Sequence, residues 1–136
     1  MTMSDRMNLF TLAQRGMSAQ MVRMNAAASN LANAGSVAGS EAEAYRSVRP
    51  VFQAQLDQAS GLTSVRVTGM QLSDAAPIKR HDPNHPLADE NGDVWDAPVD
   101  ETGEMVEIME SARQYQNLVE ALQTAKQLML ETLRSN

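Results

Sequence analysis

Two separated stretches of the chain carry the same apolar rhythm, in steps of three and four residues. In the first stretch, which Gln14 interrupts, the apolar positions are Met7, Phe10, Met17, Met21, Met24, Ala28 and Leu31. In the second, which Lys126 interrupts, they are Met105, Ile108, Ala112, Tyr115, Val119, Leu122, Met129 and Leu133. Such spacing places a narrow apolar stripe along one side of an α-helix. We therefore predict two long terminal helices that pair as a coiled coil.

The ends of both helices have recognisable signals. Ser4 is expected to cap the first helix through its hydroxyl, and the helix is expected to run to about residue 34. Gly35 then occupies the position where a left-handed residue often ends a helix. Gly16, inside this helix, indicates either a close approach by a neighbouring group or a flexible point. The second helix is expected to begin near residue 100 or 102 and to end close to residue 136.

The middle of the chain, residues 35–100, lacks the helical rhythm and predicts a small β module. Residues 35–44 are small and polar, which is typical of a flexible connector. Residues 45–52 form an extended stretch that Pro50 restricts to an edge or a short strand. Residues 65–68 alternate as a second strand, and Gly69 would end or bulge it.

Four prolines between residues 74 and 98 exclude a long helix there. Asn91 and Gly92 form a strong tight-turn signal, and Val94 and Trp95 would anchor the following loop on the strands. The predicted fold is thus mainly α with a small β module. Its parts are an N-terminal helix (1–34), a middle hairpin and loop module (35–100) and a C-terminal helix (101–136) that pairs with the first.

Charge and composition narrow the class of protein. The 136 residues carry a net charge of −6, which offers no basic patch for nucleic acid. Residues 1–34 hold three arginines against Asp5 alone, whereas residues 101–136 hold six glutamates against three cations. This opposite sign favours pairing of the two helices with each other, as partner selection more than as stabilisation. Apolar runs are too short to span a bilayer, and no cleavable signal peptide is apparent.

The candidate chemistry is weak. His81 and His85, with acidic residues nearby, offer ligands for a divalent metal, but two prolines and a turn explain the same segment as a solvated loop. Asp89 begins a pattern like that of a calcium loop, but Val94 and Asp100 stand where that pattern requires Gly and Glu. We therefore predict no catalytic residue, no metal and no cofactor.

Three asparagines in an alanine-rich helix, Asn25, Asn30 and Asn33, are more distinctive, because asparagine is unfavourable inside helices. Amides buried among small residues would fix the register between two helices, as a polar residue does in a coiled-coil seam. The alternative is that Asn30 and Asn33 merely help to end the helix.

These residues also carry a resemblance. Residues 28–34, Ala-Ser-Asn-Leu-Ala-Asn-Ala, are similar to the Asn-Leu-Ala-Asn signature of flagellar axial proteins, which are rod, hook and hook-junction components. Residues 82–92 resemble the loop typical of the proximal rod protein C family of the flagellar basal body. Residues 104–106, 112–116 and 124–130 resemble the C-terminal helix of that family.

The resemblance implies a non-catalytic subunit that passes unfolded through the flagellar type III export apparatus. It would polymerise into the hollow periplasmic rod, with its terminal helices paired in the inner tube wall and its middle module farther out. Expected neighbours are further copies, rod protein B, the other rod proteins and the basal adaptor protein E. The assembly residues would be Asn25, Asn30, Leu31, Asn33, Met105, Arg113, Tyr115, Leu122 and Met129.

Three alternatives stay open at this point. The first is another flagellar rod or hook subunit, and the second is a coiled-coil adaptor or secreted effector. The third is a small metal-dependent enzyme. The length of the helices favours assembly, because a helix of about thirty residues is roughly 45 Å long and is hard to bury within a protein of this size. Part of each stripe should therefore face other molecules, and the ends of an isolated monomer should fray.

Overall fold

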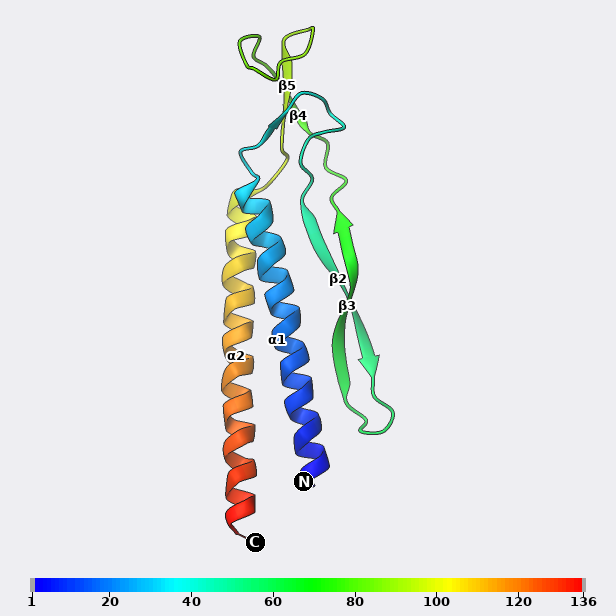
Figure 1. The fold of residues 1–136 in the computed structure, drawn as a ribbon, viewed down its shortest axis with the longest axis vertical. Helices are drawn as coiled ribbons and strands as arrows, with labels where there is room; N and C mark the ends of the chain where they lie inside the picture. Colours follow the sequence, from blue (N-terminus) through cyan, green and yellow to red (C-terminus); the bar gives the residue numbers. More distant parts are fainter. Residues whose placement is uncertain (1, 136) are drawn as a thin grey trace.

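The computed structural model describes residues 2–135 and shows two long terminal helices beside a twisted hairpin, with a small sheet at one end (Figure 1). Helix α1 spans Met3–Ala32, and helix α2 spans Glu101–Arg134. The strands between them are β1 (Val37–Ala38), β2 (Val48–Leu56), β3 (Thr63–Leu72), β4 (Ile78–His81) and β5 (Asp93–Asp96). The two helices lie side by side and run in opposite directions. The predicted mainly α fold with a small β module is confirmed.

Helix α1 begins two residues earlier than predicted. Its cap is Thr2, whose hydroxyl accepts the backbone N–H of Asp5 at 3.1 Å, while the Asp5 carboxylate accepts the Thr2 N–H at 3.1 Å. This reciprocal capping box satisfies two N–H groups, which explains why Thr2 and not Ser4 is the cap. The helix ends at Asn33 with φ −101°, and Gly35 is not left-handed, so that expectation is wrong.

Helix α2 begins as predicted. The Asp100 side chain accepts the backbone N–H of Gly103 at 3.2 Å. Glu101 and Glu104 lie in the first turn and Arg134 in the last, where their charges complement the helix dipole. Within residues 2–135, no helix is both long enough and apolar enough to cross a membrane.

Strands β2 and β3 form the predicted hairpin, which is longer than the sequence indicated. Val51 pairs with Gly69 and Phe52 with Val67, so Thr68 is an extra residue that bulges from β3. The Thr68 hydroxyl donates to the carbonyl of Val51 at 3.3 Å. Pro50 is tolerated because each strand of a two-stranded sheet is an edge.

The second sheet has the strand order β1–β5–β4 and lies beyond the ends of the helices (Figure 1). Val94 in β5 is fully buried, as expected for an anchor of this region. The prediction of a flexible connector over residues 35–44 is wrong, because Val37 and Ala38 pair with β5. Small residues allow this close packing: a Cβ on Gly39 would lie 3.1 Å from the carbonyl oxygen of Leu87.

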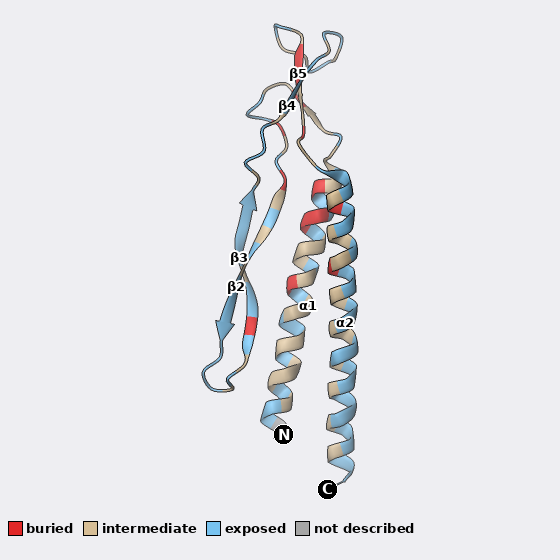
Figure 2. Ribbon diagram, turned by 180° about the vertical axis from the view of Figure 1, so that it is seen from behind, coloured by how far each residue is buried: buried red, intermediate tan, exposed pale blue. Residues whose placement is uncertain are grey.

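The core is small and made mainly of alanine. Buried residues concentrate where the helices meet the second sheet, and the halves of both helices nearer the chain termini are mostly exposed or half-buried (Figure 2). The buried apolar residues are Ala19, Ala26, Ala27, Ala38, Ala44, Val94 and Ala97. The large apolar side chains of the helices are therefore left largely outside the core.

Candidate functional site

The two terminal helices pack through small and polar residues. A Cβ on Gly16 of α1 would lie 3.0 Å from Cδ1 of Leu118 in α2, so the helices meet at van der Waals contact here. Seven residues away on α2, Ser111 is fully buried, and its hydroxyl donates to the carbonyl of Glu107 in its own helix at 2.7 Å. The Gly16 signal in the sequence therefore marked a close approach.

The buried seam is shifted by one residue from part of the predicted stripe. Both polar interruptions, Gln14 and Lys126, are exposed, whereas the preceding residues, Ala13 and Ala125, are half-buried. On α2 the seam includes Ser111, Leu118 and Ala125; of the predicted positions one residue later, Ala112 and Lys126 are exposed and Val119 is half-buried. The reason is physical: small side chains let the helix axes approach closely, and this outweighs the burial of larger apolar residues.

Each predicted stripe therefore splits into two lines of residues. On α1 the line through Phe10, Met17, Met24 and Leu31 is half-buried, and on α2 the line through Ile108, Tyr115, Leu122 and Met129 is half-buried. The other line of each helix is mostly exposed. The exposed lines of the two helices, together with large apolar residues exposed beside them, form a surface that we call the outer apolar face. Its large apolar residues are Met7, Met21, Met105, Met109, Leu130 and Leu133.

The outer apolar face continues from one helix to the other. A shallow groove of about 460 Å³ is lined by Met17 and Met21 of α1 together with Tyr115 of α2. Helical geometry places Met21 on the far side of α1 from Ala19 and Val22, which face the hairpin. A second groove, of about 670 Å³, is lined by Leu9 and Leu128 nearer the chain termini. Leu128 lies two residues before Leu130, about 200° around the helix, so this groove is on the other side of α2 from the outer apolar face.

Asn30 is the best-anchored residue of the predicted assembly motif, and its partner is a strand. It is fully buried; its Oδ1 accepts the Val48 N–H at 2.8 Å, and its Nδ2 donates to the Val48 carbonyl at 2.9 Å. The Tyr45 hydroxyl donates to the same Oδ1 at 2.7 Å. The amide of Asn30 therefore joins α1 to β2 within the subunit, which differs from the predicted contact between two helices.

The other asparagines have local or external positions. Asn33 caps α1, and its Nδ2 donates to the carbonyl of Ser29 at 2.8 Å, which fits the alternative in which it ends the helix. Asn25 is exposed on α1. Arg113 is also exposed, with Nη1 4.0 Å from Oε2 of Glu110 in its own helix. Of the remaining predicted residues, Met105 is exposed, and Leu31, Tyr115, Leu122 and Met129 are half-buried.

Ion pairs connect three elements near the second sheet. Arg23 of α1 pairs with Glu107 of α2 at 2.8 Å, as the opposite charges of the two helices favour. Arg49 of β2 binds Glu104 of α2 through both ends of its guanidinium, at 2.9 and 2.5 Å. Glu104 is only 2% exposed, and its hydrogen bonds raise the pKa of Arg49 above its ordinary value.

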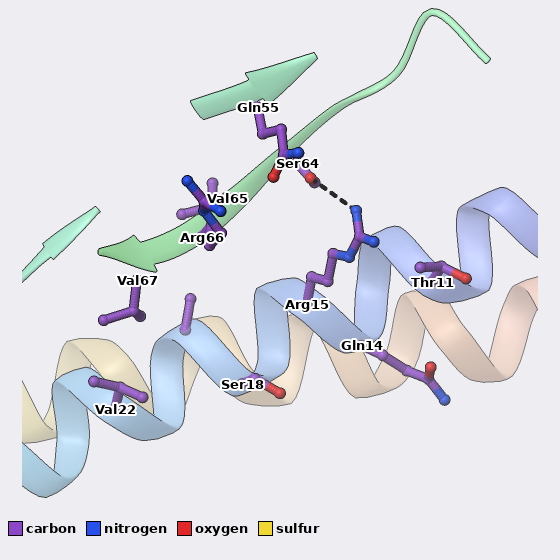
Figure 3. A pocket seen from close by; sticks show the side chains of 11 residues that line it. Thr11, Gln14, Arg15, Ser18, Val22, Gln55, Ser64, Val65, Arg66 and Val67 are labelled. Carbon is purple, nitrogen blue, oxygen red and sulfur yellow. Dashed lines mark hydrogen bonds between the residues drawn. The ribbon is translucent and has the colours of Figure 1, made fainter. Parts of the chain in front are cut away.

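The hairpin leans along α1 and encloses a groove of about 580 Å³ (Figure 3). The Arg15 guanidinium crosses this groove and donates to the hydroxyl of buried Ser64 at 3.1 Å. Val22 of α1 and Val67 of β3 approach each other farther along the groove. Within residues 2–135, no group of three or more potential metal ligands is assembled.

The polar side chains of the loop that contains both histidines, residues 81–93, form hydrogen bonds within that loop. His81 Nδ1 lies 3.0 Å from Oδ1 of Asp93, and His85 Nδ1 accepts the N–H of Leu87 at 3.0 Å. The bond to His81 is the main reason why the pKa of Asp93 lies below its ordinary value. Asp89 Oδ1 accepts the backbone N–H groups of residues 91 and 93, so this carboxylate stabilises the turn.

The chain is similar in sequence to known flagellar proteins along nearly its whole length. A family model described as flagellar basal body rod FlgEFG protein C-terminal matches residues 92–135, which include α2. The flagellar basal-body rod protein FlgC of Salmonella typhimurium is 42% identical over 127 residues, covering 93% of this chain and 95% of that protein. FlgC of Yersinia enterocolitica is 43% identical over 128 residues, with the same coverage. FlgC of Aquifex aeolicus is 31% identical over 134 residues, covering 98% of each chain. The chain therefore belongs to the flagellar basal-body rod protein FlgC family.

Proposed function

We propose that this structural subunit of the flagellar basal-body rod joins its neighbours through the outer apolar face of its paired terminal helices. The single observation that carries the proposal is the exposure of that face: Met109 is 67% exposed, Met7 56% and Leu133 55%. Large apolar patches on a protein surface usually mark interaction sites. Burial against a neighbour would stabilise the assembly by roughly 25 cal/mol for each Å² of apolar surface removed from water.

The arrangement of the face supports an open polymer. It runs along both helices, and the groove at Tyr115 adds a depression that a neighbouring side chain would fill. A head-to-tail contact that does not close into a ring generates a helical polymer, which is the geometry of a rod. The half-buried line of α1 and α2 would then become the inner core of the tube wall.

The neighbours are other flagellar rod subunits. We further propose that they include additional copies of this chain, rod protein B and, at the base, adaptor protein E, with the export apparatus delivering the subunit. Residues 35–100 would contact neighbours outside the wall formed by residues 1–34 and 101–136. The exposed apolar residues of the hairpin, Leu56, Met70 and Leu72 among them, support an outward contact surface.

The experiment is a deletion of the gene for this chain followed by electron microscopy of purified basal bodies. We expect basal bodies without a complete rod, non-motile cells, and restoration of both by the intact gene supplied in trans. A complete rod in the deletion strain would contradict the proposal. Restoration of a complete rod by an outer-face variant such as Met109→Glu would contradict the role of the outer apolar face while leaving the subunit role intact.

A further inference from the structure

We propose that the β2–β3 hairpin is an arm whose position is set jointly by both terminal helices. They hold it through two consecutive residues, Val48 and Arg49, so that the arm takes its place only when α1 and α2 are paired. The arm's outer end, around the loop between β2 and β3, lies far along the helices from this point of attachment (Figure 1).

The first contact comes from α1. The Asn30 amide offers Val48 both an acceptor and a donor, at 2.8 and 2.9 Å, which is the pair of bonds that a neighbouring strand would make. Because Asn30 is fully buried while the strand is in place, water does not compete for these bonds. The start of β2 is thereby fixed to the last turns of α1.

The second contact comes from α2, on the next residue. Nη1 and Nη2 of Arg49 donate to the two carboxylate oxygens of Glu104, in the bidentate geometry that arginine and carboxylates favour. Glu104 is 2% exposed, so without Arg49 it would be a buried charge with no cation beside it. Of the hydrogen bonds seen in residues 2–135, this is the link between the hairpin and α2.

Farther along the arm, the contacts seen within residues 2–135 are with α1. Arg15 binds Ser64 across the groove of Figure 3, and Val22 faces Val67 there. A two-stranded hairpin is marginal by itself in water. Glu104 lies in the first turn of α2, so it reaches Arg49 in this geometry when the second helix lies beside the first. Pairing of the helices and placement of the arm are therefore coupled within one subunit. This coupling is separate from the proposed contacts between subunits.

Pulsed electron paramagnetic resonance distance measurements on the full chain test this coupling. The chain has no cysteine, so spin labels at Gln53→Cys in the hairpin and Asn25→Cys in α1 report the position of the arm relative to α1, independently of where α2 lies. We expect one narrow distance distribution in the parent protein. Arg49→Gln and Glu104→Gln should each lose that narrow distribution. Arg23→Gln, which removes an arginine–glutamate pair that does not touch the hairpin, should retain it.

A variant remote from the arm tests the coupling itself. Leu118→Asp should separate the helices at the seam, measured with labels at Asn25→Cys and Gln116→Cys, and should also release the arm. Circular dichroism checks that each variant retains its helix content. If Glu104→Gln loses helix content, the test rests on Arg49→Gln, because the Arg49 side chain is half-exposed and its replacement should leave the fold intact. A narrow arm distribution in Arg49→Gln, or in Leu118→Asp with separated helices, would overturn the proposal, as would a broad distribution in the parent protein. None of these readings depends on rod assembly.

Discussion

Gly16 of α1 and Leu118 of α2 meet so closely that the methyl group Cδ1 of Leu118 lies 3.0 Å from the position that a Cβ on Gly16 would occupy. Glycine inside a helix costs up to about 1 kcal/mol relative to alanine, so its presence calls for a compensating contact. The leucine side chain supplies that contact and fixes how closely the two helices approach at the middle of the seam.

Enlarging Gly16 should destabilise the pair, and the size of Leu118 should decide by how much. Gly16→Val adds atoms where Leu118 already lies, and we expect a loss of about 1–3 kcal/mol in the free energy of unfolding. The measurement is urea unfolding followed by circular dichroism. Combining Gly16→Val with Leu118→Ala should recover part of the loss. Simple addition of the two single losses would show that the contact has no role in the approach of the helices.

Asn30 and Asn33 should differ sharply on substitution. Asn30→Ala leaves the Val48 N–H and carbonyl without their partner, and we expect a loss of about 1–3 kcal/mol in stability. Asn33→Ala removes only a bond to the same helix and should cost less. Amide hydrogen exchange at Val48 gives the direct measurement. Equal exchange at Val48 in both variants would show that the amide of Asn30 does not hold β2.

The sequence predicted the helices well because apolar spacing and capping residues are local signals. The stripes located α1 and α2, Asp100 marked the start of α2, and Gly16 marked a close approach. The exact seam was not predictable from apolarity, since Ser111 and Ala125 occupy it for their small size. Burial of Glu104 was equally hidden, because a charged residue in a first helical turn normally indicates solvent exposure.

The middle module shows the same division between local and long-range causes. The β2–β3 hairpin was predicted from alternation and from Gly69, which lies next to the bulge at Thr68. The sheet β1–β5–β4 was missed because β1 is two residues long and pairs with β5, a strand far along the chain. The length of the helices predicted that part of each apolar stripe would be exposed. The residues that form this exposed part could not be predicted, because they depend on which residues occupy the seam between the helices.

Hydrogen exchange should be graded along α1 in a dilute monomer. Between Ala19 and Asn30 the helix contacts both α2 and the hairpin, and it contains four buried residues, whereas residues 4–14 include none. We therefore expect slow exchange over residues 19–30 and fast exchange over residues 5–14, measured by mass spectrometry. Uniformly slow exchange from residue 5 to residue 33 would mean that the ends are already covered in the monomer.

The start of α1 should weaken in acid. The backbone N–H of Thr2, followed by its hydroxyl, lowers the pKa of Asp5 below its ordinary value. A carboxyl group with a lowered pKa stabilises the folded state above its ordinary pKa, at about 4, and loses this contribution as the pH falls through the folded value. Carboxyl ¹³C NMR of Asp5 should show titration below the ordinary aspartate range, and Thr2→Val should move it upward. Titration at the ordinary pH would show that the capping box does not form in solution.

The most direct test of assembly through the outer apolar face is to place charges on it. Met105→Glu with Met109→Glu puts two carboxylates on exposed positions of α2, so the monomer should keep its helix content while a neighbour could no longer bury the face. Gln116→Glu with Gln123→Glu adds the same charge at exposed polar positions of the same helix. Electron microscopy of basal bodies from cells carrying each variant should show incomplete rods for the methionine pair and complete rods for the glutamine pair. Complete rods in cells carrying the methionine variant would contradict the account.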